Sequence, residues 1–155
     1  MKLGDVLRKE RERKRLTTKE VAAKLCITED SYGEYEAGAS LIEEWGPKLA
    51  QLAIKLSTPT SRLISETGKS AQAALSNDQC GRLIRSHRER RNLSQEGLVE
   101  LLSWPVQELA QIENGDSPLE TYGPHLLRFA EAIDQPIFNL FYPCGLNYQE
   151  LEDYP

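Results

Sequence analysis

Two stretches of the sequence decide the fold. Residues 16–38 read LTTKEVAAKLCITEDSYGEYEAG, and residues 93–115 read LSQEGLVELLSWPVQELAQIENG. In each, a hydroxyl residue follows the opening Leu, apolar residues recur at spacings of three and four, and a Glu stands two positions before the closing Gly. This spacing places the apolar residues on one side of a helix. Each stretch therefore predicts short helices that pack on one core.

The start of the first helix in each stretch carries a capping signal. Thr17 and Glu20 have the spacing of a capping box, in which a hydroxyl and a carboxylate satisfy free backbone amides at a helix start. Ser94 repeats the cap in the second stretch, although Gly97 replaces the glutamate. Alternation with a period of two does not persist beyond a few residues, so no strands are expected. The fold class predicted is all-α.

The similarity extends outward on both sides of the two stretches. A shift of 77 positions superposes residues 4–65 on residues 81–142 without a gap, which favours a duplication. We therefore expect each copy to fold as a separate compact five-helix unit. The predicted organisation is a first domain at 1–66, a linker at 67–77, a second domain at 78–142 and a C-terminal tail at 143–155.

Both stretches resemble the helix-turn-helix of the Cro/C1-type (XRE) phage-repressor family. The resemblance rests on the opening Leu and Ser or Thr, the paired apolar residues before the turn, and the closing Glu-x-Gly. It implies two lambda-repressor-like helix-turn-helix domains in tandem and a transcriptional regulator that binds double-stranded DNA. In this family the second helix of the motif enters the major groove.

The resemblance assigns DNA contacts to residues of the second copy. Gln95 lies at the family's phosphate-binding Gln, and Asn114 lies at a second phosphate position. Gln107 and Gln111 are four residues apart and share a helix face, from which glutamine amides can pair with adenine. Arg85, in the preceding basic helix, can add a contact to the DNA backbone. These five residues form the candidate DNA-binding site.

Two further pairs at family positions are assigned to architecture. The resemblance implies that Arg88 and Glu113 form an ion pair between the first helix and the end of the recognition helix, and that Arg11 and Glu36 repeat it. A planar guanidinium can bind a carboxylate through two parallel hydrogen bonds. We therefore do not count these residues as DNA contacts.

The first copy departs from the family where recognition would occur. Glu29, Asp30 and Glu34 lie on its predicted recognition helix, and Gly33 weakens the middle. Neutralising phosphates supplies much of DNA-binding energy, so three carboxylates oppose it. Two interpretations stay open: a recognition helix kept only for packing, or a face that binds a protein or a second copy.

Both copies also depart from the family pattern around the motif. Cys26 and Ser103 occupy the place of the usual turn glycine, where a left-handed backbone costs about 1 kcal/mol, so a distorted turn is expected. A few residues are inserted at 45–47 and 122–124, and we expect an extra turn before the last helix there. The tail beyond Ile137 is aromatic and needs burial, in the second domain, on the first domain, or in a homodimer.

Composition limits the remaining possibilities. The net charge is −5, and the acidic excess lies from residue 69 onward, so only local basic patches can hold DNA. No stretch approaches a membrane span, and the three cysteines form no ligand pair, which favours a cytoplasmic protein with neither a metal site nor a membrane contact. His87 and His125 lack a nucleophile partner, so we expect no enzyme, no catalytic residue and no cofactor.

Two functions from different classes follow. The first is a sequence-specific transcriptional regulator with the second domain as the main base reader. Regulators of this kind exploit operators with two half-sites, so a homodimer is expected. The alternative is a protein-binding antagonist or adaptor, or an antitoxin-like protein, that keeps the fold and uses its first domain to bind a partner. The fold alone does not choose between them.

Overall fold

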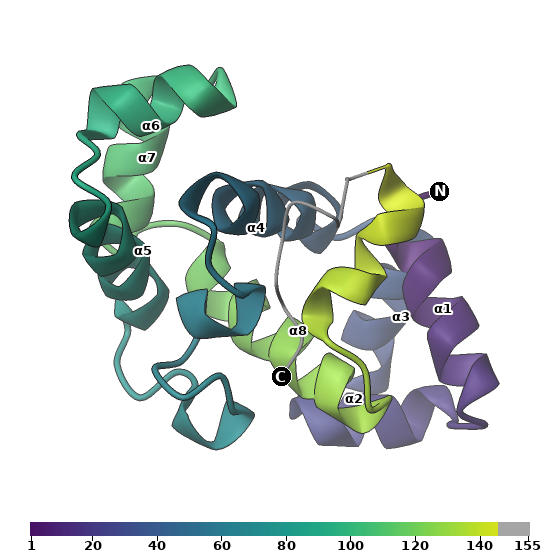
Figure 1. Ribbon diagram of the computed structural model, residues 1–155. Coiled ribbons are helices and arrows are strands. Elements are labelled where there is room, and N and C mark those ends of the chain that lie inside the picture. Colours follow the sequence, from purple (N-terminus) through teal and green to yellow (C-terminus); the bar gives the residue numbers. More distant parts are fainter. Residues whose placement is uncertain (146–155) are drawn as a thin grey trace.

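The computed structural model describes residues 1–145, and that part of the chain contains helices and no strand. The all-α prediction is confirmed (Figure 1). The first half contains α1 (Leu3–Arg13), α2 (Thr18–Leu25), α3 (Glu29–Ala37), α4 (Ile42–Leu56) and the short 3-10 helix η1 (Thr60–Leu63). The second half contains α5 (Gln79–Arg90), α6 (Gln95–Leu102), α7 (Val106–Glu113), α8 (Leu119–Ala132) and the 3-10 helices η3 (Ile137–Leu140) and η4 (Tyr142–Cys144).

The helix boundaries follow the capping signals. The Thr17 hydroxyl accepts a hydrogen bond from the Glu20 amide at 3.0 Å, and the Glu20 carboxylate accepts one from the Thr17 amide at 3.1 Å. Ser94 likewise accepts from the Gly97 amide. Cys26 and Ser103 end α2 and α6 in the left-handed conformation, with φ of 61° and 60°. Both turns therefore keep the geometry that a glycine would provide more easily.

Three helices of each half form a matched unit. α1 packs on α3, which packs on α2, and α5, α6 and α7 repeat this arrangement. The first helix approaches the end of the third so closely that only glycine fits. A Cβ on Gly4 would lie 2.5 Å from the Tyr35 carbonyl oxygen, and a Cβ on Gly81 would lie 2.3 Å from that of Ile112.

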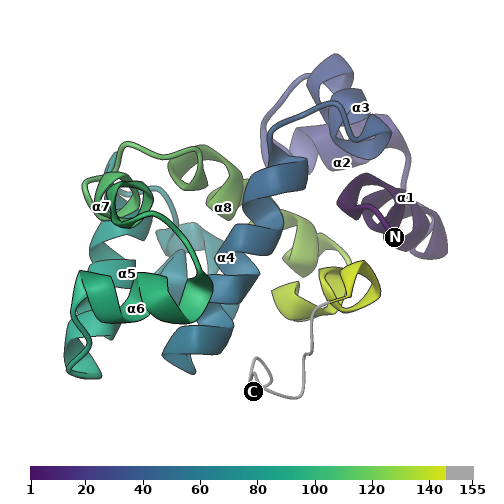
Figure 2. The ribbon, with the colours of Figure 1, turned by 90° about the horizontal axis from the view of Figure 1, so that it is seen from above.

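The last long helix of each half completes the other half. α4 packs on α6 and α5 and keeps a contact with α1, while α8 packs on α2 and also on α5 of its own half. The two helices contact each other between the units. Figures 1 and 2 show α4 and α8 between the three-helix units. The prediction of two separately packed five-helix units is therefore wrong. The inserted residues 45–47 and 122–124 are part of continuous helices, so α4 and α8 extend across to the opposite unit instead of turning back.

We call this packing of α4 and α8 on the opposite units the exchange, and it gives the two halves one shared core. Buried apolar residues of both halves form a single cluster. Glycines lie where the helices meet: a Cβ on Gly46 would lie 2.8 Å from Leu3 and 3.2 Å from Phe141, and one on Gly123 would lie 3.1 Å from the Cys80 sulfur. Small residues at these places let the helices approach closely.

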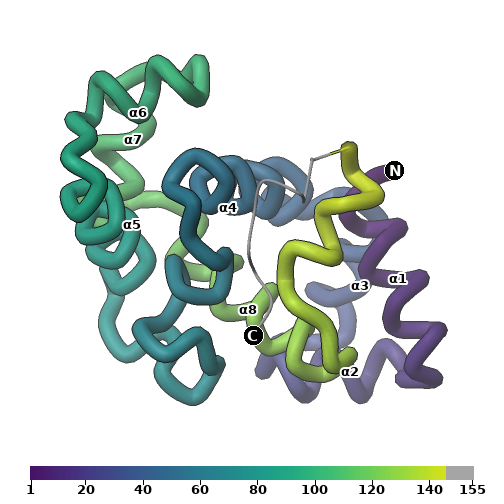
Figure 3. The backbone as a smooth tube through the Cα atoms, viewed as in Figure 1, coloured from purple at the N-terminus to yellow at the C-terminus, as the bar shows by residue number. Residues whose placement is uncertain are grey.

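The start of the tail docks on the first half. Phe138 and Phe141 are buried, η3 packs on α1, and the amino group of Met1 donates a hydrogen bond to the Pro143 carbonyl. Figure 3 shows this segment beside the N-terminal helix. Of the three places expected for the aromatic residues, the described part of the tail uses two, because η3 packs on α8 of its own half and on α1 and η1 of the first half. Tyr148 and Tyr154, which belong to the same aromatic tail, lie outside the described residues.

The predicted linker is also attached to the helices. It contains the 3-10 helix η2 (Ser70–Gln72). The amide and hydroxyl of Ser70 both donate to the Glu131 carboxylate on α8. The Gln79 side chain accepts from the Leu75 amide and donates to the Gln72 carbonyl. The predicted domain boundaries remain a proposal. Within residues 1–145, no helix has the length and apolar character needed to cross a membrane.

Gly81→Ala is expected to destabilise the protein by about 1 to 3 kcal/mol, because the new methyl group would overlap a backbone oxygen that cannot rotate away. Gly33→Ala is the matched control. It is an exposed helical glycine with no atom within 4 Å of the position that the new methyl group would take, so alanine should stabilise by about 0.5 to 1 kcal/mol. Urea denaturation of both variants measures the difference. Equal stability of Gly81→Ala and the unsubstituted chain would contradict the close packing of α5 on α7.

Candidate nucleic-acid interface

The outer face of α7 is polar and uncharged at its centre. Gln107 and Gln111 are exposed and lie one helical turn apart, and Asn114 is exposed at the helix end. Within residues 1–145, none of these three side-chain amides forms a hydrogen bond. Val106, in the first turn, is also exposed, and an apolar side chain there can contact a thymine methyl group. The face therefore presents free amide groups to the surroundings.

A buried ion pair holds α7 in place. Arg88 donates to Glu113 through Nε at 2.6 Å and through Nη2 at 2.9 Å, and its Nη1 donates to the Leu93 carbonyl at 2.7 Å. The hydrogen bonds to Glu113 raise the pKa of Arg88. Arg11 and Glu36 form the equivalent pair at 2.6 Å and 3.2 Å. Both predicted pairs are therefore architectural.

Two of the predicted DNA contacts converge on the same carboxylate. The Gln95 side chain is half-buried and donates to Glu113 Oε1 at 3.0 Å. Arg85 Nε lies 3.8 Å from the same oxygen, while 55% of its side chain stays exposed. The structure thus brings Arg85 and Gln95 together at the end of α7. Gln107, Gln111 and Asn114 lie on the exposed part of that helix.

The corresponding face of α3 is acidic. Glu29, Asp30 and Glu34 are exposed, and the Thr18 hydroxyl donates to the Glu29 carboxylate at 2.7 Å. Within residues 1–145, none of the three acids forms an ion pair. α3 is anchored by its tyrosines instead, and burial raises the pKa of Tyr35 to about 12. The acidic face is therefore open and not neutralised by the described part of the chain.

Each recognition helix is fixed by a side chain from the exchanged helix of the other half. Lys48 of α4 forms an ion pair with Glu108 of α7, and its ammonium lies 4.3 Å from the Trp45 ring centroid. At the matching position of α8, His125 Nδ1 forms a 2.8 Å hydrogen bond with the Tyr35 hydroxyl of α3. Burial lowers the pKa of His125.

These two contacts are not predictable from the sequence, because they join halves that were expected to pack separately. The only signal is that Lys48 and His125 occupy equivalent repeat positions beside the inserted residues. They position α7 and α3.

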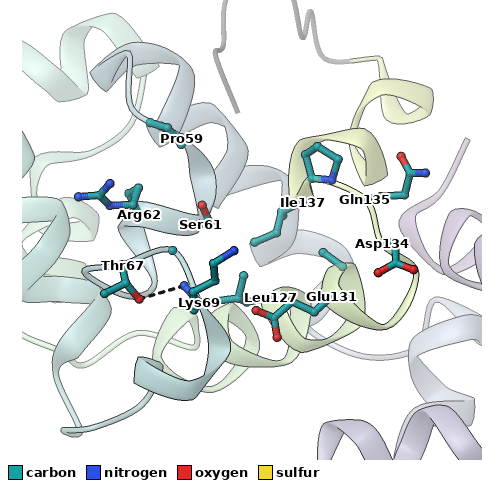
Figure 4. Close-up of a pocket in the computed structure, with 13 residues that line it drawn as sticks. Pro59, Ser61, Arg62, Thr67, Lys69, Leu127, Glu131, Asp134, Gln135 and Ile137 are labelled. Atoms are coloured by element: carbon teal, nitrogen blue, oxygen red, sulfur yellow. Dashed lines mark hydrogen bonds between the residues drawn. The ribbon is translucent and has the colours of Figure 1, made fainter. Parts of the chain in front are cut away.

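A second surface feature is a hollow of about 550 Å³ between η1 and the end of α8 (Figure 4). Its two acids are already engaged, since Glu131 accepts from Ser70 and Asp134 pairs with Lys14 at 3.4 Å. Leu127 and Ile137 supply apolar walls. Figure 4 shows the Arg62 guanidinium turned away from the hollow. We assign no function to it.

Comparison with known protein families gives two matches within the chain. The helix-turn-helix domain family matches residues 2–56 and again residues 79–135. Each match spans one three-helix unit and the long helix that follows it, and the two matches cover most of the chain. No curated protein and no solved structure matches it.

Proposed function

The chain belongs to the helix-turn-helix domain family, and we propose on this premise that it is a sequence-specific DNA-binding transcriptional regulator of the Cro/C1 type. The second half is the main base reader in this proposal. The observation that carries it is the contrast between the free amides on α7 and the unpaired acids on α3 within the described residues. Glutamine amides suit adenine edges in the major groove, whereas carboxylates oppose the phosphate charge.

The first expected result concerns the base-reading amides. Gln107→Ala and Gln111→Ala should each weaken binding to the preferred DNA by about 1 to 3 kcal/mol and reduce discrimination between sequences. Both side chains are exposed and unpaired within the described residues, so folding should be unaffected. Gel-shift titrations with random and upstream genomic DNA, across a salt series, measure both effects.

Two matched variants separate base reading from charge. Arg85→Ala should weaken binding to all sequences and flatten the salt dependence, because it removes a contact to the DNA backbone. Asp30→Ala should leave binding unchanged or improve it. If instead Gln107→Ala and Gln111→Ala bind normally while changes at Asp30 or its acidic neighbours abolish binding, the roles of the two halves are reversed.

We also propose that two chains act together on DNA. Each chain carries one recognition helix suited to reading bases, so a symmetric operator with two half-sites requires a second chain to supply a second α7. Light scattering at micromolar concentration should give the mass of a homodimer, alone or on a symmetric operator. A monomer under both conditions contradicts this part of the proposal.

The alternative function is a protein-binding antagonist or adaptor, including an antitoxin-like role. The exposed Glu29, Asp30 and Glu34, which form no ion pair within residues 1–145, favour it because such a face can bind a basic protein surface. A chain without salt-sensitive DNA binding in the gel-shift series would leave this alternative as the better account.

The contacts of the two histidines and the three cysteines agree with a binding protein. His125 is hydrogen-bonded to Tyr35, and His87 interacts with the backbone of Arg62, so both histidines have structural partners. All three cysteines are free thiols, as expected in a reducing compartment such as the cytoplasm. We therefore propose a cytoplasmic regulator without catalytic activity.

A further inference from the structure

A second hollow, of about 350 Å³, lies where η1 of the first half meets α5 of the second. It is lined by Arg62, Glu66, Arg82, Leu83, Ser86, His87 and Arg90. Arg82, Ser86 and Arg90 follow one another at intervals of four residues and therefore share one side of α5. Arg62 reaches the hollow from η1. Three arginines thus line one small concavity that both halves build.

Two of these guanidinium groups have no counter-charge. Arg62 and Arg90 form no ion pair within the described part of the chain. Arg82 does have one, with its Nε 3.0 Å from Asp78 and its Nη2 donating to the Ser76 hydroxyl at 2.7 Å. Glu66, the one acid of the lining, is exposed and makes no ion pair with the arginines in residues 1–145. The lining therefore carries an excess of positive charge in a chain whose net charge is −5.

The buried histidine beside the hollow responds to this charge. Burial lowers the pKa of His87, and the charges of Arg90, Arg91 and Arg62 lower it further. The interaction of His87 with the backbone of Arg62 opposes this shift. Ser86 adds a hydroxyl group to the lining. The hollow thus combines positive charge with hydrogen-bonding groups.

We propose that this hollow is a phosphate-binding site, in which Arg62, Arg82 and Arg90 hold the oxygens of a phosphate group. The planar guanidinium matches phosphate geometry and forms paired, charge-assisted hydrogen bonds with it. A concavity of this size is at the lower end of small-ligand sites, about 300 to 1,000 Å³. The phosphate belongs either to a small molecule or to the DNA backbone.

The site is distinct from the proposed base-reading face. Arg85 approaches Glu113 at the end of α7, whereas the arginines of the hollow line the side of α5 that meets η1. Phosphate binding here is therefore independent of which helix reads bases. Because Arg62 comes from the first half and the other two from the second, a bound phosphate would also bridge the halves.

Isothermal titration calorimetry, with inorganic phosphate added to the full chain, tests the site. Chloride keeps the ionic strength constant. Saturable binding is expected, and Arg62→Gln or Arg90→Gln should weaken it about tenfold or more, because each removes a charge-assisted hydrogen bond. Arg13→Gln is the matched control, because Arg13 is an exposed arginine of α1 outside the hollow. Circular dichroism checks that each variant is folded.

Absence of saturable phosphate binding by the unsubstituted chain would overturn the proposal, and so would equal weakening by Arg13→Gln. A gel-shift salt series on the same variants identifies the source of the phosphate. A shallower salt dependence in Arg62→Gln and Arg90→Gln supports a site for the DNA backbone. An unchanged salt dependence together with lost phosphate binding supports a site for a small phosphorylated molecule. The phosphate titration tests the site even if the chain binds no DNA.

Discussion

Residues 1–66 expressed alone are expected not to form a stable folded monomer, although they contain a complete family match. Leu49, Leu52 and Leu56 of α4 are fully buried in the whole chain. α4 packs mainly on α8, α5 and α6, which the fragment lacks, and less on α1 and η1, which it keeps. Burial of a leucine side chain contributes about 1.5 to 3 kcal/mol. Loss of three such sites is comparable with the total stability of a small domain, about 5 to 15 kcal/mol.

Circular dichroism of the fragment against concentration measures this result. Helicity should be low at low concentration and rise with concentration, because two fragments can exchange α4 with each other. The matched test adds residues 67–155, which should restore the helical signal and cooperative unfolding of the whole chain. A fragment that unfolds cooperatively as a monomer, with a stability independent of concentration, would mean that α4 can turn back at Gly46 onto its own half.

The exchange marks the limit of what the sequence predicted about the fold. The helices and caps depend on neighbouring residues, so Thr17 and Ser94 were interpreted correctly from local patterns. The expected distortion of the turns at Cys26 and Ser103 was wrong, because both residues adopt the left-handed conformation. Packing partners of α4 and α8 are not local. The gapless repeat makes the apolar faces of the two halves equivalent, so an α4 that fits α2 also fits α6, and the pattern does not distinguish the two arrangements.

The candidate site was predictable where it follows the family motif. The pairs Arg88–Glu113 and Arg11–Glu36 occur as expected, and Gln107, Gln111 and Asn114 are exposed. The site residues that join the halves were not predictable, because Lys48 and Glu108 lie far apart in the chain and meet only through the exchange. The hollow lined by Arg62 and Arg90 has the same origin.

Glu113→Ala is expected to cause the largest loss of stability among single substitutions of charged residues. Only 9% of the Arg88 side chain and 1% of the Glu113 side chain are exposed, so removing the carboxylate leaves a buried cation without a partner. Breaking such a pair costs about 3 to 5 kcal/mol. Gln95 and Arg85 would also lose the acceptor toward which both point. Urea denaturation, followed by circular dichroism, measures the change in the free energy of unfolding.

The repeat supplies an internal control for this loss. Glu36→Ala breaks the equivalent pair, but the Arg11 and Glu36 side chains are 14% and 11% exposed, so water can solvate the released cation and the cost should be smaller. Replacing both members of the buried pair, as Arg88→Met with Glu113→Leu, should recover much of the stability because no unpaired charge remains. A loss from Glu36→Ala equal to or larger than that from Glu113→Ala would show that burial does not determine the strength of these pairs. A double variant as unstable as Glu113→Ala would show that the hydrogen bonds of Arg88 to Glu113 and to the Leu93 carbonyl, rather than the unpaired charge, dominate the loss.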